Sequence, residues 1–227
     1  DMLRAVGGNL KALLALVEER LPVYTEAGKK LLPLTLSPTE APSAEAQIDD
    51  ILSLMSSTRN RIDTIEALLA AIVQGVPLVI QDAPPELETR VLFVQGLLAL
   101  LPSSARFGVT FATHSLPKTR LDAQIRFLPD QMALPDALVY HWPDAALSGN
   151  RVDDAYSRFI TSQLRLDADL VIQQTRRLTA VAAWRIKRGD RLADALGYAA
   201  YRFKIDEALL NNQPVESAEV SKVLAED

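Results

Sequence analysis

Both histidines of the chain stand beside residues with which they could do chemistry. His114 lies between Thr113 and Ser115, an order in which an imidazole could act as base and a hydroxyl as nucleophile. His141 and Asp82 each close a short apolar run, and ligand sites of open α/β sheets lie at the carboxyl ends of strands. A hydrolase or nucleotide-dependent enzyme would therefore use four strand-end residues: Asp82, Thr113, His114 and His141.

Every catalytic pattern lacks an essential part. The run from Leu78 to Asp82 is similar to the magnesium-binding strand of P-loop nucleotidases, but the glycine-rich phosphate loop ending in Gly-Lys-Ser/Thr is missing from the chain. No Gly-x-Ser-x-Gly elbow exposes a serine. Cysteine is absent, which excludes disulfides, thiolate metal ligands and a cysteine nucleophile. We therefore expect no catalytic residue, no bound metal and no cofactor.

Arginine gathers in the C-terminal part of the chain. Five arginines lie close enough in sequence to form a cationic helical face: Arg176, Arg177, Arg185, Arg188 and Arg191. Such a face could bind nucleic acid, an acidic protein or another copy of the chain. Interleaved aspartates are typical of salt-bridged helix surfaces, and the net charge is -5. Protein binding is therefore favoured over nucleic-acid binding, and self-association stays open.

The elements that would position these residues begin with an amphipathic helix. Apolar residues from Leu10 to Leu21 recur at spacings of three and four, and Asn9 can cap the first turn. Prolines, serines and threonines dominate residues 33–44, a composition that indicates a linker. We therefore predict an N-terminal helical arm over residues 1–32, followed by this linker.

Residues 45–150 are predicted to form a small α/β core. Helical spacing covers 46–74, and the segment 77–113 then has the pattern strand, helix, strand, which normally makes a parallel crossover. Two further apolar runs, 124–128 and 137–142, are bounded by prolines and are typical of short strands. This pattern predicts a sheet of three to four short strands with one βαβ unit.

Helical periodicity returns after Asn150, so residues 151–227 are predicted to be a C-terminal helical region packed on the core, with or without a domain boundary. The expected fold class is therefore helix-rich α/β, with helices both before and after the α/β core along the chain. No apolar run reaches the length of a membrane span, and the first residues lack a signal-peptide pattern. These features predict a cytoplasmic protein without a membrane partner. Because the chain starts on Asp1, we expect a piece of something longer.

One stretch, residues 62–128, combines three features. A helix ends in Ala70-Ala71-Ile72, a leucine-rich helix ends in Leu101-Pro102, and Arg106 precedes the run Val109 to Thr113. In this combination the stretch resembles bacterial GTPase-associated proteins. The resemblance implies a non-catalytic adaptor that works beside a GTPase in a bacterial multi-protein system, with no catalytic residues to carry over.

The leading interpretation is a non-catalytic protein-interaction or scaffold domain. Amphipathic helices and an asymmetric distribution of charge are what such a module needs. A hydrolase with its site at the strand ends, and a helical module that binds nucleic acid, remain the two alternatives.

Overall fold

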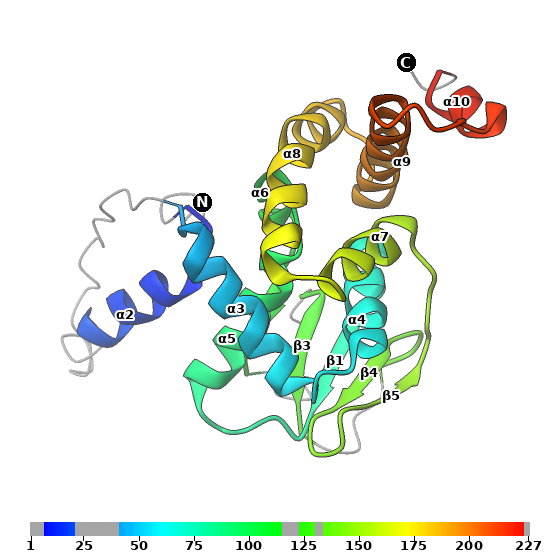
Figure 1. Ribbon diagram of the computed structural model, residues 1–227. Coiled ribbons are helices and arrows are strands. Elements are labelled where there is room, and N and C mark those ends of the chain that lie inside the picture. The colour runs from blue at the N-terminus through cyan, green and yellow to red at the C-terminus, as the bar shows by residue number, and fades with distance from the viewer. Residues whose placement is uncertain (1–6, 21–40, 115–122, 130–133, 225–227) are drawn as a thin grey trace.

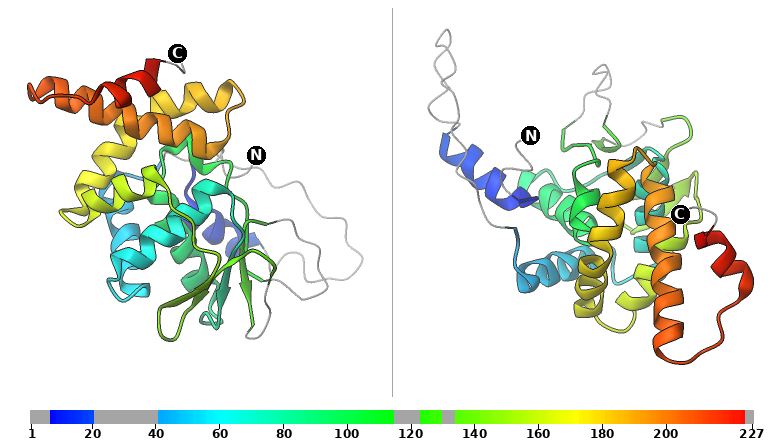
Figure 2. Two further views of the ribbon diagram at one scale, coloured as in Figure 1. Left: turned by 90° about the vertical axis from the view of Figure 1, so that its right-hand side faces the viewer. Right: turned by 90° about the horizontal axis from the view of Figure 1, so that it is seen from above.

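A computed structural model describes residues 7–20, 41–114, 123–129 and 134–224 (Figure 1). The chain is a helix-rich α/β protein, as predicted. Its strands form one mixed sheet, and helices gather on one side of it (Figure 2). Part of the predicted linker, residues 33–40, lies outside the described residues.

The sheet has five strands in the order β2-β3-β1-β4-β5. Strand β1 lies at the centre and runs parallel to both of its neighbours, while β5 runs antiparallel to β4. Strands β1 and β2 are parallel, but β3 separates them, so the predicted crossover passes over one strand. The strand bounds are Leu78–Gln81 for β1, Phe111–Ala112 for β2, Ile125–Leu128 for β3, Leu138–His141 for β4 and Ala146–Gly149 for β5.

The prediction of three to four strands was wrong because β5 has no strand signature in its sequence. Its residues, Ala-Leu-Ser-Gly, include no β-branched or aromatic side chain. The strand exists because a tight turn at Ala145, with φ 54°, folds it back onto β4. Gly149 has φ 84°, and a β-carbon there would lie 2.3 Å from the Ala137 carbonyl oxygen, so this close pairing requires glycine.

Helices α2, α3, α4 and α5 lie where helical spacing was predicted, whereas the short helices α6 and α10 were not predicted. The Asn9 side chain accepts a hydrogen bond from the Ala12 amide at 3.2 Å, and Gly75 closes its helix with φ 73°. The helix bounds are Leu10–Arg20 for α2, Ala44–Ser57 for α3, Ile62–Gln74 for α4, Leu87–Ala99 for α5, Ser103–Arg106 for α6, Ala155–Leu164 for α7, Ala168–Lys187 for α8, Leu192–Leu210 for α9 and Ser217–Leu224 for α10.

The core lies between the sheet and helices α4 and α5. Phe93 of α5 stacks on Tyr140 with ring centroids 5.5 Å apart and also contacts Phe127 and Trp142. These side chains belong to one hydrophobic cluster that continues into the C-terminal helices. Burial of this apolar surface is the main stabilising term of the fold.

The C-terminal helices continue outward from this core. Helix α7 packs on α4, α8 packs on α3 and α6, and α9 packs on α7 and α8. The Ser104 hydroxyl of α6 donates to the Thr179 carbonyl of α8 at 3.2 Å. Gly189, with φ 95°, turns the chain between α8 and α9, which form a helical hairpin away from the sheet (Figure 1).

Tyr140 makes the stability of this core sensitive to alkaline pH. Its hydroxyl donates to the Ser57 carbonyl at 2.7 Å, and burial raises the pKa of Tyr140 to about 12. An unfolded tyrosine ionises near pH 10, so the unfolded state loses this proton first. The contribution of the protonated Tyr140 to the free energy of unfolding is therefore fully present below about pH 10. It is lost as the pH rises towards about 12, by up to about 1.4 kcal/mol per pH unit.

We therefore expect Tyr140→Phe to flatten the alkaline decline in stability. Urea unfolding at pH 8, 10 and 11 measures the free energy of unfolding of both proteins. The variant starts from a lower value at pH 8, because the hydrogen bond to Ser57 is gone. It then loses less stability than the native chain between pH 10 and 11, and equal losses would contradict the assignment.

Candidate functional site

The structure places the predicted catalytic residues along one edge of the sheet. Asp82 follows β1 with φ 53°, His141 ends β4, and Thr113 and His114 follow β2. In strand order, β3 and β1 lie between β2 and β4. Three steps of about 4.8 Å put the backbones of the two histidines about 14 Å apart, so they do not share a site.

His114 contacts Arg90, and this arginine also bonds to two loops. The Arg90 guanidinium donates to the Thr113 carbonyl at 2.7 Å, to the Pro84 carbonyl at 2.7 Å, and contacts His114 Nδ1 at 3.3 Å. An arginine can only donate, so Nδ1 accepts in this contact and cannot also take a proton from a hydroxyl. The arrangement positions the β2 end, and Ser115, the neighbouring hydroxyl, lies outside the described residues.

His141 contacts a hydroxyl that sequence reasoning missed. Its Nε2 lies 3.0 Å from Ser148 Oγ, across the β4–β5 pair. A working dyad also needs a group that orients the imidazole and donors for an oxyanion. Among the described residues, no carboxylate bonds to this histidine. Asp144, the nearest in sequence, accepts a hydrogen bond from the Ala146 amide instead, at 3.2 Å.

No group of three or more potential metal ligands occurs in the part of the chain that the structure describes. The side chain of Asp82, a predicted strand-end residue, forms no hydrogen bond with another described residue, and helix α5 starts at Leu87 without a side-chain cap. The sheet edge therefore offers separate polar contacts, not one assembled site.

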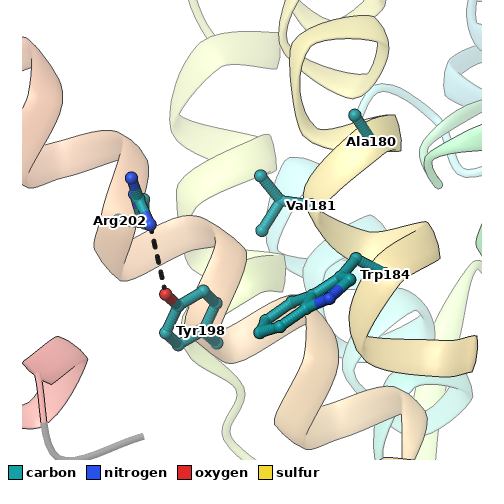
Figure 3. Close-up of a pocket in the computed structure, with 5 residues that line it drawn as sticks. All are labelled: Ala180, Val181, Trp184, Tyr198 and Arg202. Atoms are coloured by element: carbon teal, nitrogen blue, oxygen red, sulfur yellow. Dashed lines mark hydrogen bonds between the residues drawn. The ribbon is translucent and has the colours of Figure 1, made fainter. Parts of the chain in front are cut away.

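A groove between α8 and α9 is the better candidate. Its volume is about 470 Å³, and it is lined by Ala180, Val181, Trp184, Tyr198 and Arg202. Figure 3 shows the Trp184 ring of α8 extending towards α9, where the Tyr198 hydroxyl is turned to Arg202. The groove is open to solvent, and Trp184 keeps 46% of its surface exposed.

Guanidinium groups lie against both aromatic rings of the groove. Arg188 stacks over Trp184 at 4.7 Å and Arg185 over Tyr198 at 4.5 Å, contacts in which the ring face attracts the cation. The Arg202 Nη1 donates to the Tyr198 hydroxyl at 3.4 Å. The aromatic side chains are thus held in place, which lowers the entropy that binding would cost.

The five arginines predicted to form one cationic face are distributed differently. Arg185 is buried and ion-paired with Asp190, and it lies nine positions from Arg176, about two and a half helical turns, on the opposite side of α8. Arg191 forms a two-pronged bond to Asp194 at 2.8 and 3.1 Å, a hydrogen bond that lowers the pKa of Asp194. A continuous five-arginine surface is therefore not formed.

Arg177 and Arg188 do share a helix face with the groove. Positions 177, 181, 184 and 188 of the chain are three or four residues apart, so Val181 and Trp184 lie between the two arginines on one side of α8. Arg176, Arg177 and Arg188 are exposed. Sequence reasoning missed Trp184 and Tyr198, although an aromatic residue four positions before an arginine was a readable signal on each helix.

None of the described helices has both the length and the apolar composition of a membrane span. Comparison of the chain with protein-family models, with curated proteins and with solved structures found no match.

Proposed function

We propose that this chain is a non-catalytic protein-interaction domain that binds its partner in the α8–α9 groove. The observation that carries the proposal is Trp184, a large aromatic side chain left 46% exposed in an open groove. Tryptophan, tyrosine and arginine are the residues that most often dominate binding energy at protein interfaces. All three types line this groove.

The resemblance of residues 62–128 to bacterial GTPase-associated proteins supplies a class of partner. In this proposal the domain acts as an adaptor in a bacterial multi-protein system, in the cytoplasm, beside a GTPase. The resembling segment supplies strands β1, β2 and β3 with helices α4, α5 and α6, whereas the groove belongs to the C-terminal helices. The groove would therefore select the partner, and the α/β core would hold the hairpin in place.

The hydrolase alternative rests on the contact between His141 and Ser148. It is less favoured because Thr113 and His114 follow β2, three strand steps from β4, and because His114 is engaged by Arg90. The nucleic-acid alternative needs several exposed cations in a row. It is less favoured because Arg185 is buried and Arg191 is neutralised by Asp194.

Replacing Ala180, which is exposed in the groove, with a photo-crosslinking amino acid in cells that produce the protein tests the proposal. We expect one partner protein to be cross-linked at this position and not at Leu166, an exposed residue of the α7–α8 connection. The partner is then identified by mass spectrometry, purified and titrated against the full chain.

Trp184→Ala should weaken binding of that purified partner at least about tenfold, because the central aromatic contact is lost. Leu166→Ala is the matched control, since Leu166 is also an exposed apolar residue, at 74%, and should leave the affinity unchanged. Thermal unfolding of both variants checks that the fold is retained. Equal affinities of the two variants, or no cross-link at position 180, would overturn the proposal.

A further inference from the structure

The rim of the α8–α9 groove is positively charged although the whole chain carries a net charge of -5. Arg177, Lys187 and Arg188 are exposed and lie within one turn of Val181 or Trp184, and Arg202 lines the groove from α9. Three aspartates lie near this set: Asp206 is 4.0 Å from Arg202, while Asp190 and Asp194 are paired with Arg185 and Arg191. An apolar floor is thus bordered mainly by cations.

We infer that the groove binds an amphipathic helix whose apolar face is flanked by aspartate or glutamate. This inference rests on the proposed function and specifies the chemistry of the partner. Carboxylates beside the apolar stripe would pair with the rim arginines, and guanidinium groups bind carboxylates with two parallel hydrogen bonds.

The shape of the groove favours a helix as the bound segment. Helices α8 and α9 form a hairpin and pack against each other, and a third helix can lay its apolar residues between two such neighbours. A volume of about 470 Å³ accommodates anchoring side chains from successive turns of the bound helix. Trp184 and Tyr198 would contact those anchors (Figure 3).

A second copy of the chain fits this groove less well. In a symmetric dimer the same patch faces itself, so the exposed arginines of one copy would face those of the other and repel them. Single-stranded nucleic acid could stack on Trp184, but one face of that ring already carries Arg188. Charge complementarity therefore selects an acidic protein segment.

Three fluorescent peptides of about 20 residues test the inference, a length at which designed sequences become helical. They share one leucine stripe and differ only in the flanking positions, which are all glutamate, all glutamine or all lysine. Anisotropy titrations use the full chain at two salt concentrations. We expect the glutamate peptide to bind at least about tenfold more tightly than the lysine peptide, with the advantage shrinking as salt rises.

Two variants locate the binding. Trp184→Ala should weaken the glutamate peptide about tenfold, and the double variant Arg177→Glu with Arg188→Glu should reverse the preference to the lysine peptide. The chain has two tryptophans, so in Trp142→Phe the remaining fluorescence reports Trp184 directly. A change in that emission on adding the glutamate peptide places the peptide in the groove.

Equal affinity for all three peptides, or a preference that the double variant does not reverse, would overturn the inference. Tighter binding of a labelled single-stranded oligonucleotide, or a dimer in sedimentation that Trp184→Ala dissociates, would also overturn it and name the occupant. If a partner is cross-linked at position 180 but charge makes no difference, only this inference fails. If no partner is cross-linked either, the proposed function fails with it.

Discussion

Gly96→Ala should lower the free energy of unfolding by about 1–3 kcal/mol, although alanine normally favours a helix. Gly96 lies in α5, where that helix crosses α3. A β-carbon at this position would lie 2.6 Å from the Asp50 carbonyl oxygen and 2.7 Å from the Leu54 β-carbon. Both contacts involve atoms fixed by the α3 backbone, so the two helices must separate.

Gly197→Ala is the matched control, because Gly197 also lies within a helix, α9, but a β-carbon there meets no atom within 4 Å. Only the helix preference of alanine remains, and stability should rise by about 0.5–1 kcal/mol. Urea unfolding of both variants at neutral pH measures the two changes. Changes of the same sign would show that the α3–α5 contact does not require glycine.

The contrast between these two glycines shows what a single sequence can predict. The helix that contains Gly96 was predicted from the strand, helix, strand pattern of residues 77–113, which is a local signal. The need for glycine at position 96 comes from Asp50, 46 positions earlier in the chain. Local periodicity carries no information about such a contact, so the helices were predicted and their crossing was not.

The candidate site divides in the same way. Strand ends at His114 and His141 could be placed from apolar runs, but the strand order that separates them depends on long-range pairing. The arginines after residue 175 were recognised as a cationic set, yet burial of Arg185 and its pairing with Asp190 follow from the turn at Gly189. Residue type predicted the chemistry, and tertiary packing decided which side chains can use it.

The groove depends on supports that lie far from it in sequence. Helix α8 packs on the short helix α6, and Arg106, the last residue of α6, is 4% exposed. The Arg106 Nε donates to the Leu101 carbonyl at 2.9 Å, and Nη2 donates to the Gln47 side-chain oxygen at 2.7 Å. Burial lowers the pKa of Arg106 to about 10, and the nearby Tyr156 and Asp50 partly offset that effect.

Arg106→Met should therefore lower the free energy of unfolding by about 2–6 kcal/mol, because each of two buried acceptors left without its donor costs about 1–3 kcal/mol. Methionine fills much of the same space, but it leaves the Leu101 carbonyl and the Gln47 oxygen without their donor. Asp50, 2% exposed, keeps its ion pair with Lys11 at 2.6 Å. The free-energy cost of buried acceptors without a donor exceeds the desolvation free energy that is recovered when the buried charge is removed. Urea unfolding measures the loss.

The control is Arg165→Met, since Arg165 also donates to a side-chain oxygen of another helix, Asp63 at 2.6 Å, but these two side chains are 52% and 90% exposed. Water screens this pair, so its loss should cost less than about 1 kcal/mol. If both variants lose a similar free energy of unfolding, the buried hydrogen bonds of Arg106 stabilise the fold no more than an exposed ion pair does. A large loss of unfolding free energy for Arg106→Met alone would instead support the buried role of Arg106. If that variant also binds the partner more weakly at urea concentrations below its unfolding midpoint, then α6 supports α8 and so shapes the groove.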